Sequence, residues 1–233
     1  DIAIIGSGPG GYVAAIRAAQ KGAKVALIEK DRLGCTCLNR GCIPTKAMIR
    51  DAELYRDATS GIYCVDAVGG FRLDFARLMR RKRQVVDSLV GGVARLLASL
   101  AVDIITGTGR IVEPGLVEVA GGGQTCEIAS QVIIIATGSV AARVPIPGAE
   151  LSGVLTSDDV LELQALPKSM VVVGGSVIGL EFACIFLALG TQVTVLGRKS
   201  FLKEAEQRLA KRLRSLLSRN GMSITIGVDF KRI

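Results

Sequence analysis

Two glycine-rich segments of the same design constrain the fold more strongly than any other feature of this sequence. The first is GSGPGG at positions 6–11, and the second is GGSVIG at positions 174–179. Each follows a short apolar run and precedes a stretch of small and apolar residues, a glycine and another apolar run. Equivalent positions lie 168 residues apart. An apolar run, a tight turn, a helix and a second apolar run predict a βαβ unit with parallel strands.

The glycines of the first segment have separate tasks. Gly6 permits a tight turn, Gly8 lets the backbone approach a pyrophosphate, and Gly11 allows the helix to pack closely on the strand. Amides at the start of that helix would face the anion. Glu29 follows the second apolar run, where its carboxylate can bind an adenosine ribose. Glycine turns also serve merely to reverse a chain, but the complete strand, helix, strand and acid favour a dinucleotide site.

The second segment departs from the first at two positions. Gly174 and Gly179 keep the pattern, and Gly175 lies between its first two positions. Ser176, however, stands where the middle glycine is expected, and Gly197 stands where the acid is expected. The serine side chain makes the pyrophosphate position tighter or supplies a hydroxyl donor. We still expect a second dinucleotide here, because the rest of the unit is repeated.

The residues after Gly197 bear on the choice between NAD and NADP. Arg198 and Lys199 are cations, and without an acid nothing repels a ribose 2′-phosphate, which favours NADPH. Two solvated basic residues after a strand explain the same sequence equally well. Both interpretations stay open from the residues alone.

Two cysteines, Cys37 and Cys42, lie soon after the first unit, in the segment GCTCLNRGCIPTK at positions 34–46. In a regular α-helix their Cα atoms would be roughly 8.5 Å apart, whereas a disulfide tolerates about 7 Å. They can therefore bond only if the backbone leaves a regular helix between them. Gly41 and Pro44 are residues that permit this.

Three interpretations compete for these cysteines: a redox disulfide, a pair of inert buried thiols, and a metal site that also uses Cys35. The metal site is the weakest, because zinc prefers four ligands and the sequence contains no histidine. The six cysteines follow no secretory leader, which indicates a reducing compartment, where a disulfide is usually catalytic. We expect a redox-active disulfide and no metal.

Two charged residues lie near these features. Lys46 follows Cys42 by one helical turn, where its ammonium can stabilise a thiolate or can be a surface lysine. Glu181 lies in the first turn of the helix in the second unit, where the helix dipole favours an anion. Its alternative role is an ion pair with Lys46. We expect the cysteines without a motif to be core thiols: Cys64, Cys126 and Cys184.

Composition favours a soluble, cytoplasmic, globular protein. Hydrophobic residues make up 49% of the 233 positions, which is enough for a core. The net charge of +8 is distributed, and its densest cluster, at 77–83, contains no aromatic residue, which favours a solvated helix face over a nucleic-acid site. Residues 170–189 resemble a membrane span by hydropathy, but they contain the second glycine turn, so a buried strand and helix explain them better.

Together these motifs resemble the flavin-dependent pyridine nucleotide-disulfide oxidoreductases. Members of that family carry a GGTCxxxGCxPSK-like segment after an FAD cradle, and the corresponding segment here is 34–46. The match continues through 90–93, 107–110, 133–139 and 171–181. It implies an α/β fold with two Rossmann-like dinucleotide-binding domains, the FAD/NAD(P)-binding fold, of which the second is incomplete.

The resemblance implies an FAD-binding domain with a redox-disulfide helix at 1–148 and a partial NAD(P)-binding domain at 149–233. We expect a helical hairpin at about 46–100 and a linking β-segment to about 129. FAD would lie on the first cradle, held by Gly6, Gly8, Gly11, Glu29, Lys30, Thr36, Lys46, Gly109, Thr137, Gly138 and Ser139. NAD, or alternatively NADP, would lie on the second, held by Gly174, Gly175, Ser176, Gly179, Gly197 and Arg198.

By the same resemblance, the catalytic residues are Cys37, Cys42, Lys46 and Glu181. Cys37 would exchange with a dithiol, Cys42 would face the flavin, and the lysine and glutamate would pair beside flavin N5. Electrons would pass from the dithiol, such as a lipoyl group on a carrier protein, through the disulfide and FAD to NAD. We expect neither a nucleic acid nor a membrane as a partner, and a homodimer in the full-length form.

Further expectations follow where the sequence departs from the family. Members run about twice as far, so we expect this to be the N-terminal part of a longer chain, with the general base for the dithiol outside it. The alternatives are an NADPH-dependent disulfide or mercuric reductase relative, and a truncated nucleotide-binding module without turnover. Cys35 replaces the family's second glycine. If that position needs a positive φ, cysteine costs about 1–3 kcal/mol of backbone strain.

Overall fold

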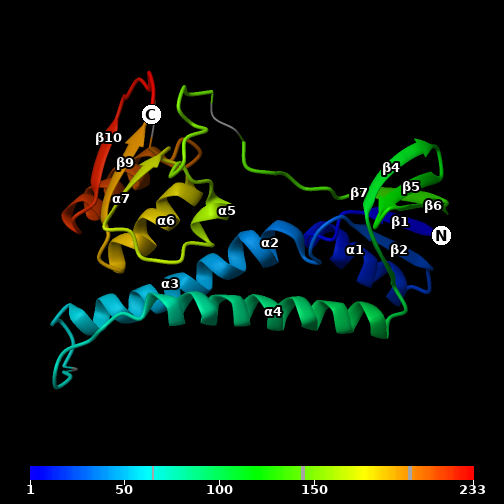
Figure 1. Ribbon diagram of the computed structural model, residues 1–233, viewed down its shortest axis with the longest axis horizontal. Helices are drawn as coiled ribbons and strands as arrows, with labels where there is room; N and C mark the ends of the chain where they lie inside the picture. Colours follow the sequence, from blue (N-terminus) through cyan, green and yellow to red (C-terminus); the bar gives the residue numbers. More distant parts are fainter. Residues whose placement is uncertain (65, 143–144, 199–200) are drawn as a thin grey trace. The chain divides into compact units, whose positions relative to one another are not determined.

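A computed structural model describes residues 1–64, 66–142, 145–198 and 201–233. The chain divides into two compact units, and each draws on two stretches of sequence (Figure 1). The first unit comprises Asp1–Pro44 and Arg83–Val140, and the second comprises Thr45–Lys82 and Ala141–Ile233. The assignment of residues 1–148 to FAD and 149–233 to a nicotinamide nucleotide concerns ligands and stays a prediction.

A parallel sheet forms the centre of the first unit. Its strand order is β3-β2-β1-β7, with β1 at Ile2–Ile5, β2 at Val25–Glu29, β3 at Asp103–Thr106 and β7 at Val132–Ile135. All three pairings are parallel. Helix α1, Pro9–Gln20, connects β1 to β2. The predicted first βαβ unit is therefore confirmed.

The two faces of this sheet bury different layers, because alternate residues of a strand point to opposite sides. On one face, Ile4 packs with Ala15 of α1 and with Leu97. On the other face, Ala3 packs with Val117. Val117 belongs to the second, antiparallel sheet, whose strands are β4 at Thr108–Glu113, β5 at Leu116–Gly121 and β6 at Gln124–Ala129. This sheet confirms the predicted β-segment.

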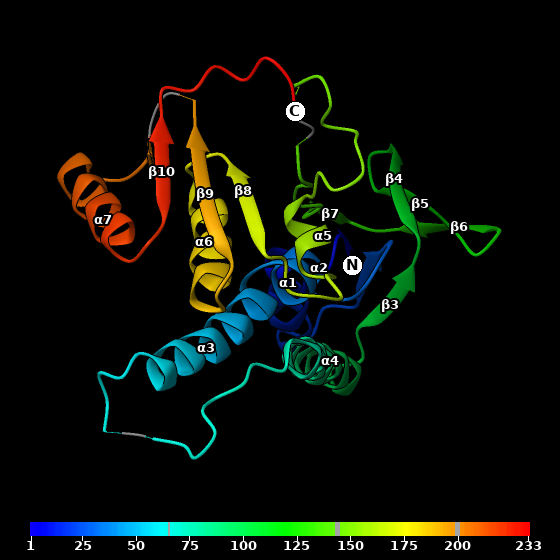
Figure 2. The same ribbon diagram turned by 60° about the vertical axis from the view of Figure 1, so that its left-hand side comes forward.

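The second unit contains the repeated βαβ element. Its parallel strands are β8 at Ser169–Val173, β9 at Gln192–Gly197 and β10 at Ser223–Ile226, in the order β10-β9-β8 (Figure 2). Its helices are α5 at Ser157–Val160, α6 at Val177–Ala188 and α7 at Gln207–Arg219. In α6, Phe182, Ala183, Ile185 and Phe186 are buried in one hydrophobic cluster. That burial accounts for the hydropathy of the later part of α6. The prediction of a buried strand is wrong for β8, where Val171 and Val173 are 61% and 43% exposed, because no further strand is described beyond β8 at this edge of the three-stranded sheet. No described helix is both long and apolar enough to cross a bilayer.

Two long helices confirm the predicted helical hairpin. They are α3, Cys42–Thr59, and α4, Phe75–Ser99. The buried face of α4 recurs at helical spacing and includes Phe75, Leu78, Met79, Lys82 and Val86.

The prediction that the basic residues at 77–83 form a solvated face is wrong for Lys82. Its side chain is only 3% exposed, and its ammonium donates to the Leu161 carbonyl and lies 3.3 Å from Glu162 Oε1. Helical periodicity placed Lys82 on the buried face of α4, and these two oxygens accept its charge there.

The two glycine turns have the same backbone geometry. Gly6 has φ of 101° and Gly174 has φ of 119°, in the left-handed region that favours glycine. The Gly6 amide donates to the Ile28 carbonyl at 2.8 Å, and the Gly174 amide donates to the Leu196 carbonyl at 2.7 Å. These are equivalent bonds at the repeat distance, so the structure confirms the internal repeat.

The adjacent glycines Gly10 and Gly11 should differ sharply in their tolerance of alanine. A Cβ at Gly11 would lie 1.8 Å from the Gly6 carbonyl oxygen, whereas a Cβ at Gly10 would meet nothing within 4 Å. We expect Gly11→Ala to lower the free energy of unfolding by about 2–3 kcal/mol. Gly10→Ala, the matched control, should leave it unchanged or raise it by up to about 1 kcal/mol. Chemical denaturation measures both, and equal effects would contradict the packing described for α1.

Candidate functional site

The first candidate nucleotide site, which we call the first cradle, is formed by the glycine turn at residues 6–11 where β1 ends. The loop after β7 comes close to this turn. A Cβ at Gly6 would lie 2.3 Å from the Ala136 carbonyl oxygen and 3.0 Å from Thr137 Cα. Thr137, Gly138 and Ser139 are exposed at this point. The structure therefore brings two groups of predicted FAD-binding residues together.

Glu29 is the most heavily hydrogen-bonded side chain of the first cradle. Its residue is only 6% exposed. Oε2 accepts the amide of Ser7 at 2.9 Å, the hydroxyl of Ser7 at 2.6 Å and the thiol of Cys35 at 2.7 Å. Oε1 accepts the amide of Asp31 at 2.9 Å. The carboxylate thus connects the end of β2 to the glycine turn and to the start of the cysteine segment.

The ionisation of Glu29 reflects these bonds. Burial alone raises the pKa of this carboxyl, but the bonds from Cys35, Ser7 and Asp31 outweigh it and hold the pKa below its ordinary value. Hydrogen bonds to the charged form of a carboxyl act in this direction. Glu29 is therefore an anion at neutral pH, as a hydrogen-bond acceptor for ribose hydroxyls must be.

Cys35 adopts a left-handed backbone conformation, so the condition under which cysteine carries backbone strain at this position is met. Its φ is 44°, and that of Gly34 is 88°. Burial first, and then the hydrogen bond to Glu29, raises the pKa of the Cys35 thiol. The contacts of Ser7 and Cys35 with Glu29 were missed by sequence reasoning.

The cysteine segment leaves regular helical geometry where the sequence indicated. Helix α2, Cys35–Arg40, ends at Gly41, which has φ of −134° and ψ of −115°, and α3 begins at Cys42. A Cβ at Gly41 would lie 3.1 Å from the Thr36 carbonyl oxygen and 3.4 Å from Cys37 Cα. Cys37 is half-buried and Cys42 is exposed. The backbone break is confirmed, while the disulfide and the separate roles of the cysteines stay predictions.

Lys46 and Glu181 form an ion pair within the second unit. The Lys46 ammonium donates to Glu181 Oε1 at 2.6 Å, across 135 positions of sequence. The two side chains are 56% and 29% exposed. Lys46 follows Cys42 by four residues on α3, and residues at this spacing share a helix face. The pairing is observed, and its role in catalysis stays a prediction. The placement of Glu181 in the first turn of α6 is wrong, because the helix begins at Val177 and its first turn contains no acidic residue.

The second cradle, the glycine turn at residues 174–179, repeats the first, but its helix packs less tightly against the turn. A Cβ at Gly179 would lie 3.0 Å from the Gly174 carbonyl oxygen. Ser176 precedes the first turn of α6 with φ of −84° and ψ of 169°, a conformation open to any residue. Its side chain is exposed and makes no capping hydrogen bond. Serine is therefore accommodated here without backbone strain.

The other predicted cofactor residues are distributed over both units. Lys30 and Thr36 are exposed, and so is Arg198, which follows the buried Gly197. The carbonyl of Gly175 accepts the amide of Leu202 at 2.9 Å. A Cβ at Gly109 would lie 3.2 Å from Ile5 Cγ2, so this glycine gives β4 close contact with the parallel sheet. Lys199 lies outside the described residues.

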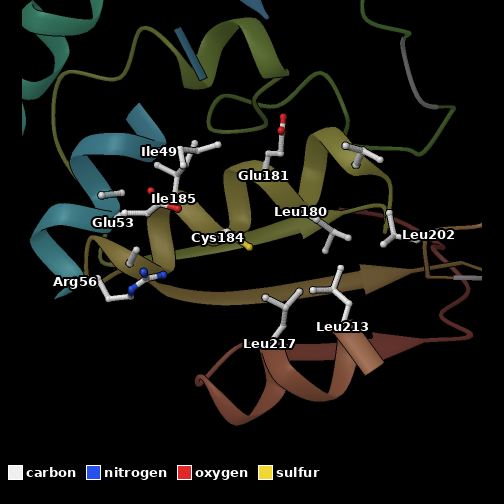
Figure 3. A pocket seen from close by; sticks show the side chains of 13 residues that line it. Ile49, Glu53, Arg56, Leu180, Glu181, Cys184, Ile185, Leu202, Leu213 and Leu217 are labelled. Atoms are coloured by element: carbon white, nitrogen blue, oxygen red, sulfur yellow. The ribbon is translucent and has the colours of Figure 1, made fainter. Parts of the chain in front are cut away.

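An apolar pocket of about 280 Å³ lies within the second unit, between α3, α6 and α7 (Figure 3). Glu53 and Arg56 of α3 and Glu181 and Cys184 of α6 contribute its polar groups. Burial, aided by the Glu181 charge and opposed by Arg56, raises the pKa of the Cys184 thiol. This thiol is therefore protonated at neutral pH and behaves as an apolar group.

The prediction that Cys64, Cys126 and Cys184 are core thiols is wrong for two of them. Cys64 and Cys126 are exposed, and Cys184 is half-buried. Cys64 lies in the loop between the two long helices, and Cys126 lies on β6, whose residues are mostly exposed. Among the described residues, no group of three or more cysteine, aspartate and glutamate side chains is placed to hold a metal ion.

The two glycine-turn βαβ units, with the cysteine segment beside the first, are the features to compare with known proteins. The family model described as pyridine nucleotide-disulphide oxidoreductase matches residues 1–233. A dihydrolipoyl dehydrogenase of Bacillus subtilis (strain 168) is 41% identical, with 97% of this chain and 50% of the relative aligned. A dihydrolipoyl dehydrogenase of Acholeplasma laidlawii is 39% identical, with 100% of this chain and 70% of the relative aligned.

The fold comparison agrees with the sequence comparison. The HOCl-induced flavoprotein disulfide reductase RclA of Escherichia coli, solved as a Cu(II) complex, matches with a TM-score of 0.86 and 32% identity. The match covers 100% of this chain and 50% of that one. This chain belongs to the pyridine nucleotide-disulphide oxidoreductase family. It spans about half the length of the Bacillus relative and of the Escherichia structure. The expected fold class and family are thus confirmed.

The Glu29 network predicts a specific pH dependence of stability. Because the folded pKa lies below the ordinary value of 4.5, ionised Glu29 stabilises the fold above that pH. The contribution is lost as the pH falls through the folded pKa. We expect Glu29→Gln to lower the free energy of unfolding by about 1–3 kcal/mol at pH 7, and the difference from the unsubstituted protein should shrink below pH 4.5. Denaturation curves across pH measure this, with Glu113→Gln, an exposed carboxylate on β4, as the control. A difference independent of pH would contradict the network.

Proposed function

We propose that this protein is the N-terminal part of an FAD-dependent dithiol/disulfide oxidoreductase of the dihydrolipoyl dehydrogenase type. One observation carries the proposal: the helix break at Gly41 starts α3 at Cys42 and brings the backbone of residue 41 against Cys37. The break removes the regular helix whose spacing would hold the two cysteines too far apart for a disulfide, although no disulfide joins these two described residues in the structure. The relatives named dihydrolipoyl dehydrogenase support this subfamily. We propose the activity from that name together with the helix break.

The cofactor sites follow from the two cradles. FAD would bind to the first, where the glycine turn, the α1 amides and the Glu29 carboxylate converge, and NAD would bind to the second. FAD supplies an acceptor for two electrons when it is bound. The residues present fit the adenosine half of such a ligand, because Glu29 is buried, anionic and held at the end of β2. We therefore keep residues 1–148 as the FAD-binding domain and 149–233 as a partial NAD(P)-binding domain.

The cysteines would carry out thiol–disulfide exchange. One thiolate of the dithiol attacks Cys37 Sγ, which forms a mixed disulfide, breaks the Cys37–Cys42 bond and releases Cys42 as a thiolate. The second thiolate of the substrate then attacks the mixed disulfide and releases Cys37, so the substrate loses two electrons and the cysteine pair gains them. The ammonium of Lys46 lies one helical turn from Cys42 and favours its thiolate. Glu181 holds that ammonium in place.

The substrate, partner and location are further parts of the proposal. A lipoyl group on a carrier protein is the dithiol that the subfamily name of the relatives suggests. Loss of its proton needs a general base, for which histidine is the usual group, and this sequence contains none. We propose that the base lies in the half of the relatives that this chain does not match. We also propose a homodimer for the longer form and a cytoplasmic location.

A dithiol titration followed by visible absorption tests the proposal. The protein is loaded with FAD, and reduced lipoamide is added without oxygen. We expect the flavin absorption to shift in the unsubstituted protein and to stay unchanged in Cys42→Ser, because without Cys42 there is no Cys37–Cys42 disulfide to accept the two electrons of the dithiol.

Cys64→Ser is the matched control, since Cys64 is exposed in the loop between α3 and α4 and should leave the shift intact. FAD binding without any shift in the unsubstituted protein would favour the alternative, a truncated nucleotide-binding module without turnover. The reason to consider that alternative is that this chain aligns with only 50% of the length of the Bacillus relative.

The choice of nicotinamide nucleotide gives a separate prediction. We expect NADH to reduce the flavin at least about tenfold faster than NADPH in stopped-flow measurements, because the family resemblance implies NAD as the acceptor, whereas Gly197 in place of the acid favours NADPH. Arg198→Ala should change the NADH rate less than the NADPH rate, since a cation at position 198, past the end of β9, would pair with the 2′-phosphate that only NADPH carries. A preference for NADPH that disappears in Arg198→Ala would instead identify an NADPH-dependent disulfide or mercuric reductase relative.

A further inference from the structure

The Glu29 carboxylate has little capacity left for another hydrogen-bond donor. An ionised carboxylate offers about four acceptor positions, two on each oxygen. Here Oε2 accepts three donors, two from Ser7 and one from Cys35, and Oε1 accepts one donor from Asp31. A ribose hydroxyl that approaches Oε2 would therefore compete with a donor already present.

Cys35 is the donor that distinguishes this chain from its family. The family segment GGTC has glycine at the corresponding position, which supplies no side-chain donor. The Cys35 side chain also reaches over the glycine turn, because a Cβ at Gly8 would lie 3.5 Å from Cys35 Cβ. Its thiol lies 3.7 Å from the Ser7 hydroxyl, so thiol, hydroxyl and carboxylate form one cluster beside the phosphate-binding turn.

We propose that Cys35 weakens binding of the adenosine ribose of FAD, because its thiol occupies the acceptor position on Glu29 Oε2 that a ribose hydroxyl needs. This inference rests on the proposed function, since it takes the first cradle as the FAD site. The thiol must turn away before both ribose hydroxyls can reach the carboxylate. Cys35 is a positioning residue in this scheme, and it makes the flavin more readily exchangeable than a glycine would.

The thiol is a donor rather than a nucleophile under these conditions. Burial and the hydrogen bond to Glu29 both raise the pKa of Cys35, so the protonated form predominates at neutral pH. Thiol reactivity requires the thiolate. The contact with Glu29 therefore keeps Cys35 from competing with Cys37 and Cys42 in disulfide exchange.

Two substitutions separate the hydrogen bond from the backbone. Cys35→Ala and Cys35→Ser both keep a Cβ at the left-handed position, but only serine keeps a donor. Each flavin-free protein is titrated with FAD and with FMN, with its thiols reduced, and flavin fluorescence reports the dissociation constant. Thermal unfolding of each variant checks that the fold is retained.

We expect Cys35→Ala to bind FAD about tenfold more tightly than the unsubstituted protein, which corresponds to one hydrogen bond to a charged acceptor. Cys35→Ser should bind FAD within about twofold of the unsubstituted protein. FMN, which lacks the adenosine ribose, should bind all three proteins alike.

Equal FAD affinities of the alanine and serine variants would overturn the inference and leave the proposed function standing. Tighter binding of FMN by Cys35→Ala would overturn it as well, because the effect would not act through the ribose. If none of the proteins bound FAD, the proposed function would fail and the inference with it.

Discussion

The close approach of α1 to the end of β1 is the contact on which the first unit depends. Only glycine fits at position 11, because a Cβ there would overlap the carbonyl oxygen of Gly6. This approach directs the first amides of the helix toward the turn and places Ser7 where its amide and hydroxyl reach Glu29. The proposed nucleotide site would thus arise from backbone packing, with the acidic side chain added to a geometry that the backbone already sets.

Glu29 then connects elements that are distant in sequence. Its two oxygens hold the turn after β1, the backbone after β2 and the beginning of α2. Because α2 carries the cysteine segment, the carboxylate at the proposed nucleotide site also fixes the starting point of that segment. The cradle and the cysteines are therefore parts of one hydrogen-bonded arrangement within the first unit.

The sequence was sufficient to predict features that depend on local backbone geometry. Glycine spacing identified both βαβ elements, and the distance limit of a disulfide identified Gly41 as a point of departure from helix. Features that depend on tertiary packing were harder to predict from the sequence. Lys82 was assigned to a solvated face because its neighbours are basic, although its spacing from Phe75 and Leu78 places it on the buried face. The periodicity was a usable signal, and charge alone was misleading.

Contacts between residues far apart in the sequence could be predicted only in part. The Lys46–Glu181 pair was one of two alternatives for Glu181, since no local pattern chooses between a helix dipole and a lysine 135 positions away. The contact of Cys35 with Glu29 could not be read at all, because it requires left-handed backbone at both Gly34 and Cys35. Likewise, no motif indicated whether Cys126 would be exposed or buried, because its exposure depends on which elements cover β6.

The two glycine turns also differ in how much sequence change they can absorb over evolutionary time. A methyl group at position 11 would overlap a carbonyl oxygen, whereas one at position 179 needs its neighbours to move by only a few tenths of an ångström. Drift should therefore erode the glycine pattern of the second copy first, and Ser176 already shows one such replacement in an unstrained backbone. In more distant descendants of this duplication, the first turn would remain recognisable after the second had lost its signature.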